Sequence, residues 1–146
     1  MKNALIERTG TTFVGDLVEQ IAVAKFMSQG LYVSKPVTQA PYDLIVEGAK
    51  LFKIQCKKAR FKEDYVCFNI SSMTYSKKDG RQSYDYHGKI DYFYSYCFEL
   101  DRHFLVPISA VGISEFRIRI GPPKVSYTSM NQESEFLFNK QIVSML

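Results

Sequence analysis

The segment from Pro41 to Ala59, PYDLIVEGAKLFKIQCKKA, constrains the fold more than any other part of the chain. In its second half apolar and polar residues alternate, which is the period of a β-strand with one buried face. The apolar face carries Phe52, Ile54 and Cys56, and the polar face carries Lys53, Gln55 and Lys57. Gly48 marks a turn after a preceding strand, YDLIVEG. The segment therefore predicts two paired strands that bring Asp43 close to Gln55 and Lys57.

The other segments predict helices packed against a sheet. Apolar residues recur with a helical period after Thr11, where a threonine is expected to cap the helix, and Gly30 is expected to end it. Further strands are expected in LYVSKPV, DYVCFNISS, IDYFYSYCFEL, HFLVPIS and FRIRI. A loop is expected from Ser76 to Gly88, and a final amphipathic helix from about Ser134 to Met145. This order predicts an α/β (α+β) fold with a central mixed β-sheet flanked by helices.

Length and composition exclude several classes of protein. A chain of 146 residues predicts a single domain, residues 1–146, with a core that needs no disulfide or structural metal. The three cysteines lie in apolar runs without CxxC spacing, so we expect buried free thiols rather than a disulfide framework or a zinc site. The sequence shows no secretory signal and no window of 18 apolar residues. We therefore expect a cytoplasmic protein that does not span a membrane.

Positive charge is concentrated in two places, although the net charge is only +4. The range 50–62 contains six basic residues and no acidic one. A second basic group, Lys77, Lys78 and Arg81, stands in the predicted loop. This distribution permits a polyanionic partner such as DNA. Solvated strand edges and loops explain the same charges equally well.

A carboxylate on the predicted helix extends the polar set of the strands. Glu19 follows Gly15 at i+4 and precedes Ala22, so its helix stripe is otherwise small or apolar. A carboxylate that faces a sheet is costly unless it is paired, here with Lys25 or Lys53, or binds a metal. Two acids, an amide oxygen and a lysine that converge would suit Mg²⁺, with the lysine orienting or deprotonating a water.

The order helix Glu19, Pro41-x-Asp43, an eleven-residue gap and Gln55-x-Lys57 resembles the PD-(D/E)XK nuclease superfamily. That superfamily includes restriction enzymes, Holliday junction resolvases and repair nucleases. The pattern YDLIVEG…KIQCKKA in so short a chain is similar to small cyanobacterial group I intron-encoded homing endonucleases with a restriction-endonuclease-like core. The resemblance covers roughly residues 15–109.

The resemblance implies a Mg²⁺-dependent endodeoxyribonuclease and a role for each matching residue. Metal ligands would be Asp43, Gln55, the Cys56 carbonyl and Glu19, and the catalytic set would be Glu19, Asp43, Gln55 and Lys57. Lys57 would position the attacking water, Mn²⁺ would substitute for Mg²⁺, and Ca²⁺ would bind without supporting cleavage. Position 55 departs from the family pattern, because a neutral glutamine replaces an acid, which should weaken metal binding.

The resemblance also implies double-stranded DNA as substrate. The expected DNA-contacting residues are Lys58, Arg60, Lys77, Lys78, Arg81, Arg117 and Arg119, the last two as readers of base edges from a two-stranded ribbon. One site per chain implies a homodimer or homotetramer on a pseudo-palindromic target, with the C-terminal helix as a candidate interface. Two alternatives stay open: a Holliday junction resolvase, and a DNA-binding protein whose nuclease site has degenerated.

Overall fold

The structure, a computed structural model, describes residues 4–78, 80–121, 131–144 and 146, apart from the side chains of residues 72–76, 81–84, 141 and 142. The helices are α1 (Ala4–Thr9), α2 (Thr11–Met27), α3 (Glu133–Phe136) and α4 (Lys140–Val143), with a short 3₁₀ helix, η1, at Ile108–Ala110. The strands are β1 (Tyr32–Ser34), β2 (Leu44–Glu47), β3 (Leu51–Lys62), β4 (Tyr65–Asn69), β5 (Ser71–Ser76), β6 (Gly80–Asp85), β7 (Tyr92–Cys97), β8 (Arg102–Pro107) and β9 (Glu115–Arg119).

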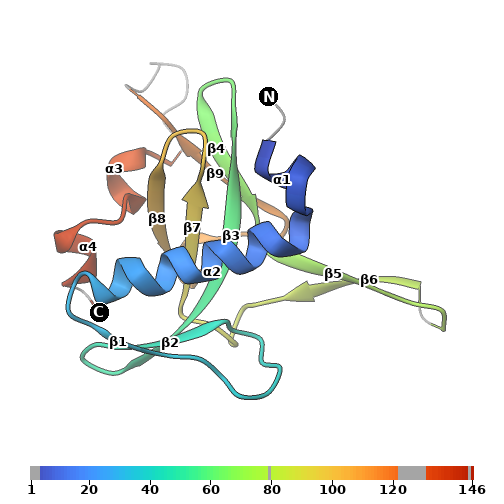
Figure 1. Ribbon diagram of the computed structural model, residues 1–146, viewed down its shortest axis with the longest axis horizontal. Helices are drawn as coiled ribbons and strands as arrows, with labels where there is room; N and C mark the ends of the chain where they lie inside the picture. The colour runs from blue at the N-terminus through green and yellow to red at the C-terminus, as the bar shows by residue number, and fades with distance from the viewer. Residues whose placement is uncertain (1–3, 79, 122–130, 145) are drawn as a thin grey trace.

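The long strand β3 organises a seven-stranded sheet (Figure 1). Residues Leu51–Ile54 pair with β2 in antiparallel fashion, and Ile54–Ala59 pair with β7 in parallel. Ile54 pairs with both Leu44 of β2 and Tyr92 of β7, so these two strands lie on opposite edges of β3. The other pairings in this sheet, β1–β2, β3–β4, β4–β9 and β7–β8, are antiparallel. The sheet is therefore mixed, as the sequence predicts.

One edge of β3 is left open where β2 ends. Among the described residues, Gln55–Ala59 pair with β7 alone, and β4 pairs with β3 from Arg60 onward. We call the side of Gln55–Ala59 that faces away from β7 the open edge of β3. Backbone N–H and C=O groups at such an edge need other partners, so side chains or a ligand can bind there.

Two hydrophobic clusters lie on the two faces of the central strands. Helix α2 crosses one face and packs against β1, β2, β3 and β7 (Figure 1). This first cluster includes Val18, Ala22, Phe26, Leu44, Val46, Ile54, Tyr94 and Leu105. The second joins β7 and β8 to β4, β9 and α3, and includes Phe68, Phe93, Phe104, Phe116 and Phe136. Side chains that alternate along β7 thus enter two different cores, which fixes the register of β7 against β3.

The start of the main helix differs from the sequence prediction. Gly10, with a φ of 90°, is the N-cap residue of α2, and no side chain caps the helix, so the predicted threonine cap is wrong. The preceding helix α1 is not predicted by the sequence, because its six residues lack an apolar period and bury no side chain. At the other end α2 stops at Met27, and Gly30 follows in a turn with a φ of 80°, close to the predicted end.

The predicted loop from Ser76 to Gly88 is wrong, because it contains β6. Strands β5 and β6 form a separate two-stranded hairpin that projects from the body of the protein (Figure 1). Ile70 separates β4 from β5: its side chain is buried, and its N–H donates to the Ser114 carbonyl (3.1 Å). This contact interrupts the single strand that the sequence predicts over residues 64–72.

The predicted C-terminal helix is also wrong in the described residues. Two four-residue helices, α3 and α4, stand in its place. Between them Phe138 donates its N–H to the His103 carbonyl (2.8 Å), and Leu137 forms an isolated bridge with Phe104. Backbone pairing with β8 thus replaces the helical hydrogen bonds. None of the helices in the described part of the chain combines the length and apolar character needed to cross a bilayer.

Gly48→Ala is expected to destabilise the protein by about 1–3 kcal/mol, because it overpacks a tight contact. A Cβ atom at Gly48 would lie 2.5 Å from the Leu146 carbonyl oxygen and 2.7 Å from its carbon. Leu146 is buried, and its carbonyl accepts the Ala49 N–H (2.8 Å). Urea unfolding measures the change. Gly112→Ala is the control, since nothing lies within 4 Å of its added Cβ, and equal stability of both variants would refute the contact.

Candidate active site

Asp43 is fixed against the open edge of β3. It precedes β2 and donates its backbone N–H to the Ile54 carbonyl (2.9 Å), while its carboxylate accepts the Cys56 N–H (2.8 Å). Because the N–H and C=O of one strand residue point to the same edge, the Cys56 carbonyl faces the same side as Asp43. The predicted approach of Asp43 to the second strand is therefore confirmed, and the carboxylate and the Cys56 carbonyl lie at one edge.

Glu19 reaches this place from the middle of α2. Its carboxyl group comes close enough to that of Asp43 for the two to interact, and the Nζ of Lys35 lies 3.7 Å from its Oε2. Burial, the hydrogen bond to Asp43 and the charge of Asp43 together raise the pKa of Glu19 to about 7, against a smaller opposite effect of Lys35. Two carboxyl groups this close share an excess of negative charge that a cation would offset.

Lys35 is a site residue that the sequence does not predict. The sequence offers Lys25 or Lys53 as partners of Glu19, but these lysines lie over the rings of Phe138 (5.6 Å) and Tyr42 (5.5 Å). Lys35 follows β1, and β1 packs against α2. Its approach to Glu19 depends on this tertiary contact, which no local spacing in the sequence reveals.

A pocket of about 210 Å³ opens beside the two carboxyl groups. It is lined by Glu19, Lys35, Pro36, Thr38, Gln39, Ala40, Tyr42 and Asp43. A water molecule takes about 30 Å³ in the liquid, so the pocket has room for several waters or for one small anionic group with its waters. Glu19 and Asp43 are therefore open to a ligand from this side.

Lys57 and Gln55 share one face of β3 by strand alternation, and both are half buried. The Nζ of Lys57 stands 5.1 Å from the centroid of the Tyr86 ring. Burial lowers the pKa of Lys57, and the charge of Asp43 acts in the opposite direction. Gln55 pairs with Phe93 of β7 in the strand register. The structure thus gathers Glu19, Asp43, Cys56 and Lys57 around one strand segment, and their chemical roles stay predictions.

The donor set at the open edge fits a hard divalent cation. The two carboxyl groups of Glu19 and Asp43 supply charged oxygen ligands, and the Cys56 carbonyl is a neutral oxygen donor of the kind Mg²⁺ accepts. Gln55 precedes Cys56 in β3, and the role of its amide as a ligand stays a prediction. Burial, with the charges of Asp43 and Glu19, raises the pKa of the Cys56 thiol, which therefore stays protonated. Within the described residues no three His, Cys, Asp or Glu side chains cluster to hold a metal ion. Metal binding here would accordingly rely on the amide, the backbone carbonyl and water as well as the carboxylates.

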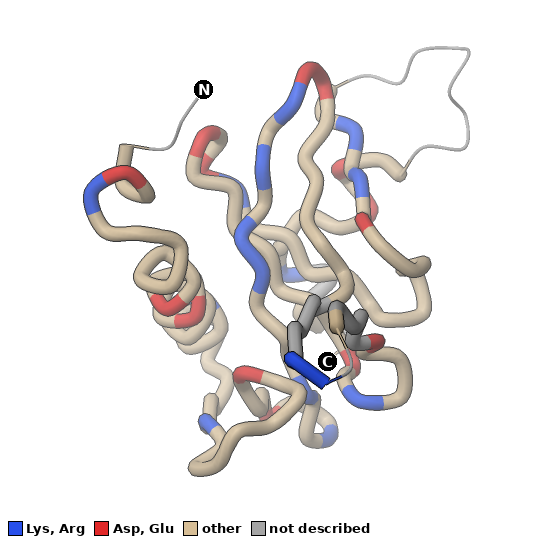
Figure 2. The backbone as a smooth tube through the Cα atoms, turned by 90° about the vertical axis from the view of Figure 1, so that its right-hand side faces the viewer, with Lys and Arg blue, Asp and Glu red and all other residues tan. Residues whose placement is uncertain are grey.

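Basic residues continue along β3 beyond the site (Figure 2). Lys58 is half buried, and Arg60 and Lys62 are exposed, all on the strand face that also carries Cys56. Cations spaced along a strand in this way suit contacts with a phosphate backbone. The predicted DNA contacts of Lys58 and Arg60 are thus compatible with their placement, and they stay predictions.

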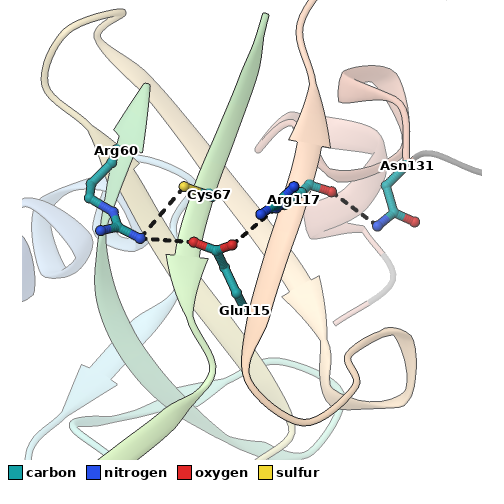
Figure 3. A network of polar contacts seen from close by, with 5 residues as sticks. All are labelled: Arg60, Cys67, Glu115, Arg117 and Asn131. Atoms are coloured by element: carbon teal, nitrogen blue, oxygen red, sulfur yellow. Dashed lines mark hydrogen bonds and ion pairs between the residues drawn. The ribbon is translucent and has the colours of Figure 1, made fainter. Parts of the chain in front are cut away.

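One carboxylate, Glu115 of β9, joins two exposed arginines, one on β3 and one on β9 itself (Figure 3). Arg60 donates to Glu115 Oε1 (2.8 Å), and Arg117 donates through Nε to Glu115 Oε2 (3.0 Å). Arg60 also lies 3.8 Å from the Cys67 sulfur, and the Arg117 guanidinium lies 4.9 Å from the centroid of the Tyr65 ring. The arginine side chains are 47% and 53% exposed, so both retain surface for a further anion. The group carries a net positive charge in an ordered arrangement.

Arg119 does not share this surface with Arg117. Its side chain is 5% exposed and forms an ion pair with Asp64 (3.1 Å). Its backbone N–H donates to the Asn131 carbonyl (2.8 Å), and the Asn131 amide donates to the Arg117 carbonyl (3.1 Å; Figure 3). A guanidinium enclosed to this degree has no free edge to read a base. The geometry therefore supports a structural role for Arg119 in place of the predicted base contact.

The predicted basic loop is the tip of the β5–β6 hairpin. Lys77 and Lys78 are exposed in its turn, and Arg81 lies on β6 with its side chain outside the described atoms. The projecting hairpin (Figure 1) holds these residues away from the main sheet, where they could reach a long partner. The three cysteines are free, with Cys67 and Cys97 buried and Cys56 half buried, as the sequence largely predicts.

Raising the pH is expected to destabilise the metal-free protein through Glu19. Its folded-state pKa of about 7 exceeds the ordinary value of 4.5, so the folded chain holds this proton more tightly than the unfolded chain. The stability linked to the proton is fully present below pH 4.5 and is lost as the pH rises through 7. Glu19→Gln should therefore be less sensitive to pH, and more stable than the wild type above pH 7. Urea unfolding in a chelating buffer measures this, with Glu47→Gln as the control, and an unchanged pH dependence in Glu19→Gln would contradict it.

Comparison with known proteins identifies the family of the chain. Residues 9–139 match the sequence profile of the PD-(D/E)XK endonuclease family. The fold is similar to the solved structure of a bacterial homing endonuclease, I-Ssp6803I, with a TM-score of 0.71, 18% identity, and coverage of 92% of this chain and 93% of that chain. No curated protein sequence matches this chain. Because the family profile spans nearly the whole chain and includes every residue of the candidate site, the chain belongs to the PD-(D/E)XK endonuclease family.

Proposed function

We propose that this protein is a Mg²⁺-dependent, site-specific endonuclease of the homing type that hydrolyses phosphodiester bonds in double-stranded DNA. The observation that carries the proposal is the meeting of Glu19 and Asp43 at the open edge of β3, beside the segment that carries Gln55 and Lys57. Family membership supports DNA as the substrate. The fold similarity to a homing endonuclease favours the homing type among the members of the family.

Asp43, Gln55 and the Cys56 carbonyl would hold the metal, and Glu19 would bind a second ion directly or through water. Bound Mg²⁺ would polarise the scissile phosphate and offset its charge. Asp43 is oriented for this role by the Cys56 N–H, which occupies one of its oxygens and fixes the carboxylate at the edge. Lys35, paired with Glu19, supplies a positive charge on the pocket side of the site.

Lys57 would act on the attacking water. Its lowered pKa makes the neutral amine more accessible than in an ordinary lysine, and Nζ can then accept a proton from that water. The water oxygen forms a bond to phosphorus as the bond from phosphorus to the 3′ oxygen breaks, and solvent protonates the leaving oxygen. The products are a 5′-phosphate and a 3′-hydroxyl, in keeping with the family.

DNA would lie along the basic residues that extend from the site. Lys58 and Arg60 continue from the open edge of β3, and Arg117 adds a guanidinium that Glu115 and Tyr65 hold in place. Lys77 and Lys78 at the hairpin tip would reach a second part of the duplex. Contacts to phosphates position the protein, so base selection would depend on groove contacts by the hairpin or Arg117.

Cutting both strands would require a homodimer or homotetramer, because each chain contributes one site. Two-fold symmetry would then favour a pseudo-palindromic target. The interface is not expected to be a long C-terminal helix, since Phe136 and Phe138 of that region are buried in the chain's own cores. We expect such an assembly to act in the cytoplasm, at the nucleoid.

The glutamine at position 55 is the reason to consider an alternative function, in which the protein binds DNA without cleaving it. The oxygen of an amide is a neutral ligand, so the site holds the two carboxylates of Glu19 and Asp43 where the family pattern has a further acid. A resolvase would use the same residues but read branched shape. The resolvase differs from the proposed function in the DNA that it would cut, whereas the DNA-binding protein would cut none.

Cleavage of a randomised duplex library and of a four-way junction, in Mg²⁺ and in EDTA, tests the proposal. Metal-dependent cutting of one long sequence by the wild type, with loss in Lys57→Ala, is the expected result. Junction cutting without sequence preference would replace the proposal with a resolvase. DNA binding with no cutting of either substrate would mean that Gln55 marks a lost activity.

A further inference from the structure

The ring of Tyr86 lies against the Lys57 side chain. The distance from Nζ to the ring centroid is 5.1 Å, and Tyr86 is 5% exposed. An ammonium group over an aromatic face is attracted by the negative charge of the ring face, more strongly where water is excluded. Lys57 is itself half buried. The ring therefore attracts the Lys57 ammonium group without forming an ion pair with it.

Tyr86 is itself fixed against the strand pair that bears the site. Its ring packs edge to face on Phe93, with centroids 5.5 Å apart and an interplanar angle of 84°. Phe93 is the residue of β7 that pairs with Gln55 of β3. The ring is thus held beside the segment Gln55–Lys57 by a buried aromatic contact, which is a rigid support for a long side chain.

The backbone around Tyr86 is also anchored. Tyr86 follows directly on β6, and its carbonyl accepts the Lys89 N–H (3.0 Å). The next residue, His87, donates its N–H to Asp85 Oδ1 (3.0 Å), and its ring contacts the same oxygen (2.6 Å) and the Val111 carbonyl (3.3 Å). The base of the β5–β6 hairpin is therefore tied both to itself and to the segment after η1, with Tyr86 between these ties and β3.

We propose that Tyr86 is a positioning residue for Lys57. Tyr86 is not part of the family pattern. Its ring restricts the rotamers of the Lys57 side chain so that Nζ stays near the Asp43 end of the open edge. Lysine has a flexible four-carbon stem, so an unsupported ammonium would spread over many positions. The same contact links the base of the basic hairpin to the site. A displacement of the hairpin on DNA would therefore change the position of the Lys57 side chain. The catalytic part of this inference rests on the proposed nuclease function.

The contact is tested first without metal or DNA. A ring face shifts the resonances of protons above it, so the terminal methylene protons of Lys57 should be moved upfield in a ¹H–¹³C spectrum, with Lys57→Ala identifying the signal. We expect the shift to persist in Tyr86→Phe, which keeps the ring, and to vanish in Tyr86→Leu. An unshifted Lys57 methylene in the wild type would overturn the proposal whatever the enzyme does.

Single-turnover cleavage tests the consequence. At saturating enzyme with Mg²⁺, Tyr86→Leu should cut roughly 10- to 100-fold more slowly, because a catalytic group displaced by about 1 Å loses this much. Tyr86→Phe should restore most of the rate, and DNA affinity measured in Ca²⁺ should stay unchanged. In a Lys57→Ala background, Tyr86→Leu should have no further effect, since the residue acts through Lys57.

Phe104→Leu is the matched control, because Phe104 is buried in the same hydrophobic cluster but belongs to β8. If it slows cleavage as much as Tyr86→Leu at a similar loss of melting temperature, Tyr86 is merely structural and the proposal fails. An unaltered cleavage rate in Tyr86→Leu would also overturn it, with the nuclease function intact. If the wild type cuts no DNA but the methylene shift behaves as expected, the proposed function fails while the contact stands.

Discussion

Asp43→Asn is expected to reduce DNA cleavage on the order of 10³-fold, because it removes a ligand charge that would stabilise the metal and, through it, the transition state. Asparagine retains a side-chain oxygen that can accept the Cys56 N–H, so the bond that holds residue 43 to the open edge survives. The fold should therefore persist, and the loss should appear in the rate. Single-turnover cleavage with saturating protein measures it, and affinity for the uncut site in Ca²⁺ shows whether DNA is still bound.

Glu47→Gln is the matched control for the Asp43 experiment. Glu47 ends β2, the strand that Asp43 precedes; it is exposed and pairs across the sheet with Tyr32 and Leu51. It is four residues from Asp43, roughly 13 Å along a strand, which is too far to share one ion. Glu47→Gln should cut at the wild-type rate. Wild-type cleavage by Asp43→Asn would remove Asp43 from the mechanism, and equal losses in both variants would indicate a general effect of charge.

Lys57→Ala is expected to lower the single-turnover rate by roughly 10²- to 10⁴-fold, the range for a group that transfers a proton to or from a reacting atom. The lysine lies on the face of β3 that packs against Tyr86. Burial lowers its pKa, and the charge of Asp43 opposes this shift. Binding of intact DNA should change little, because a half-buried ammonium at the site makes a small part of the phosphate contact. Rates across a range of pH values, set beside the affinity of each variant, separate the two effects.

The neighbouring Lys58→Ala supplies the contrast. Lys58 points to the opposite face of β3 and begins the row of cations that continues through Arg60. Its loss should weaken DNA binding and reduce the salt dependence of binding by about one ion, with the rate at saturation preserved. Two adjacent lysines would then affect two different quantities. A Lys57→Ala variant that behaves like Lys58→Ala, with weaker binding and a normal rate, would show that Lys57 is a phosphate contact and not a catalytic group.

The sequence predicts the strand pair of the site well because short-range patterns determine it. Alternation in LFKIQCKKA and the turn at Gly48 fix which faces are polar and bring Asp43 next to Cys56. The period of α2 likewise places Glu19 on a side that faces the sheet. Such features need a few neighbouring residues and one hydrophobic face, so the mixed sheet and the helix against it follow from the same reasoning.

Local sequence patterns do not predict the role of residues that depend on tertiary contacts. Lys35 approaches Glu19 because β1 packs beside α2, and Arg119 is enclosed because Asp64 lies close to it. A strand pattern cannot distinguish the exposed Arg117 from the buried Arg119, since both stand on one face. The β5–β6 hairpin escapes prediction because its segment is polar and offers no apolar alternation, and the C-terminal region forms two short helices because β8 takes its backbone hydrogen bonds.

The parallel pairing of β3 with β7 has a consequence for the order of folding. Ser95 of β7, whose hydroxyl donates to the Lys57 carbonyl (2.9 Å), lies 38 residues further along the chain. The β2–β3 hairpin can form early from local contacts, but closing so long a loop is slow and costs entropy first. During synthesis the hairpin therefore emerges before the strand that holds its other edge. A nascent chain therefore carries Asp43 and Lys57 before the candidate site is ordered, and the site can form only after β7, in the second half of the chain, has been made.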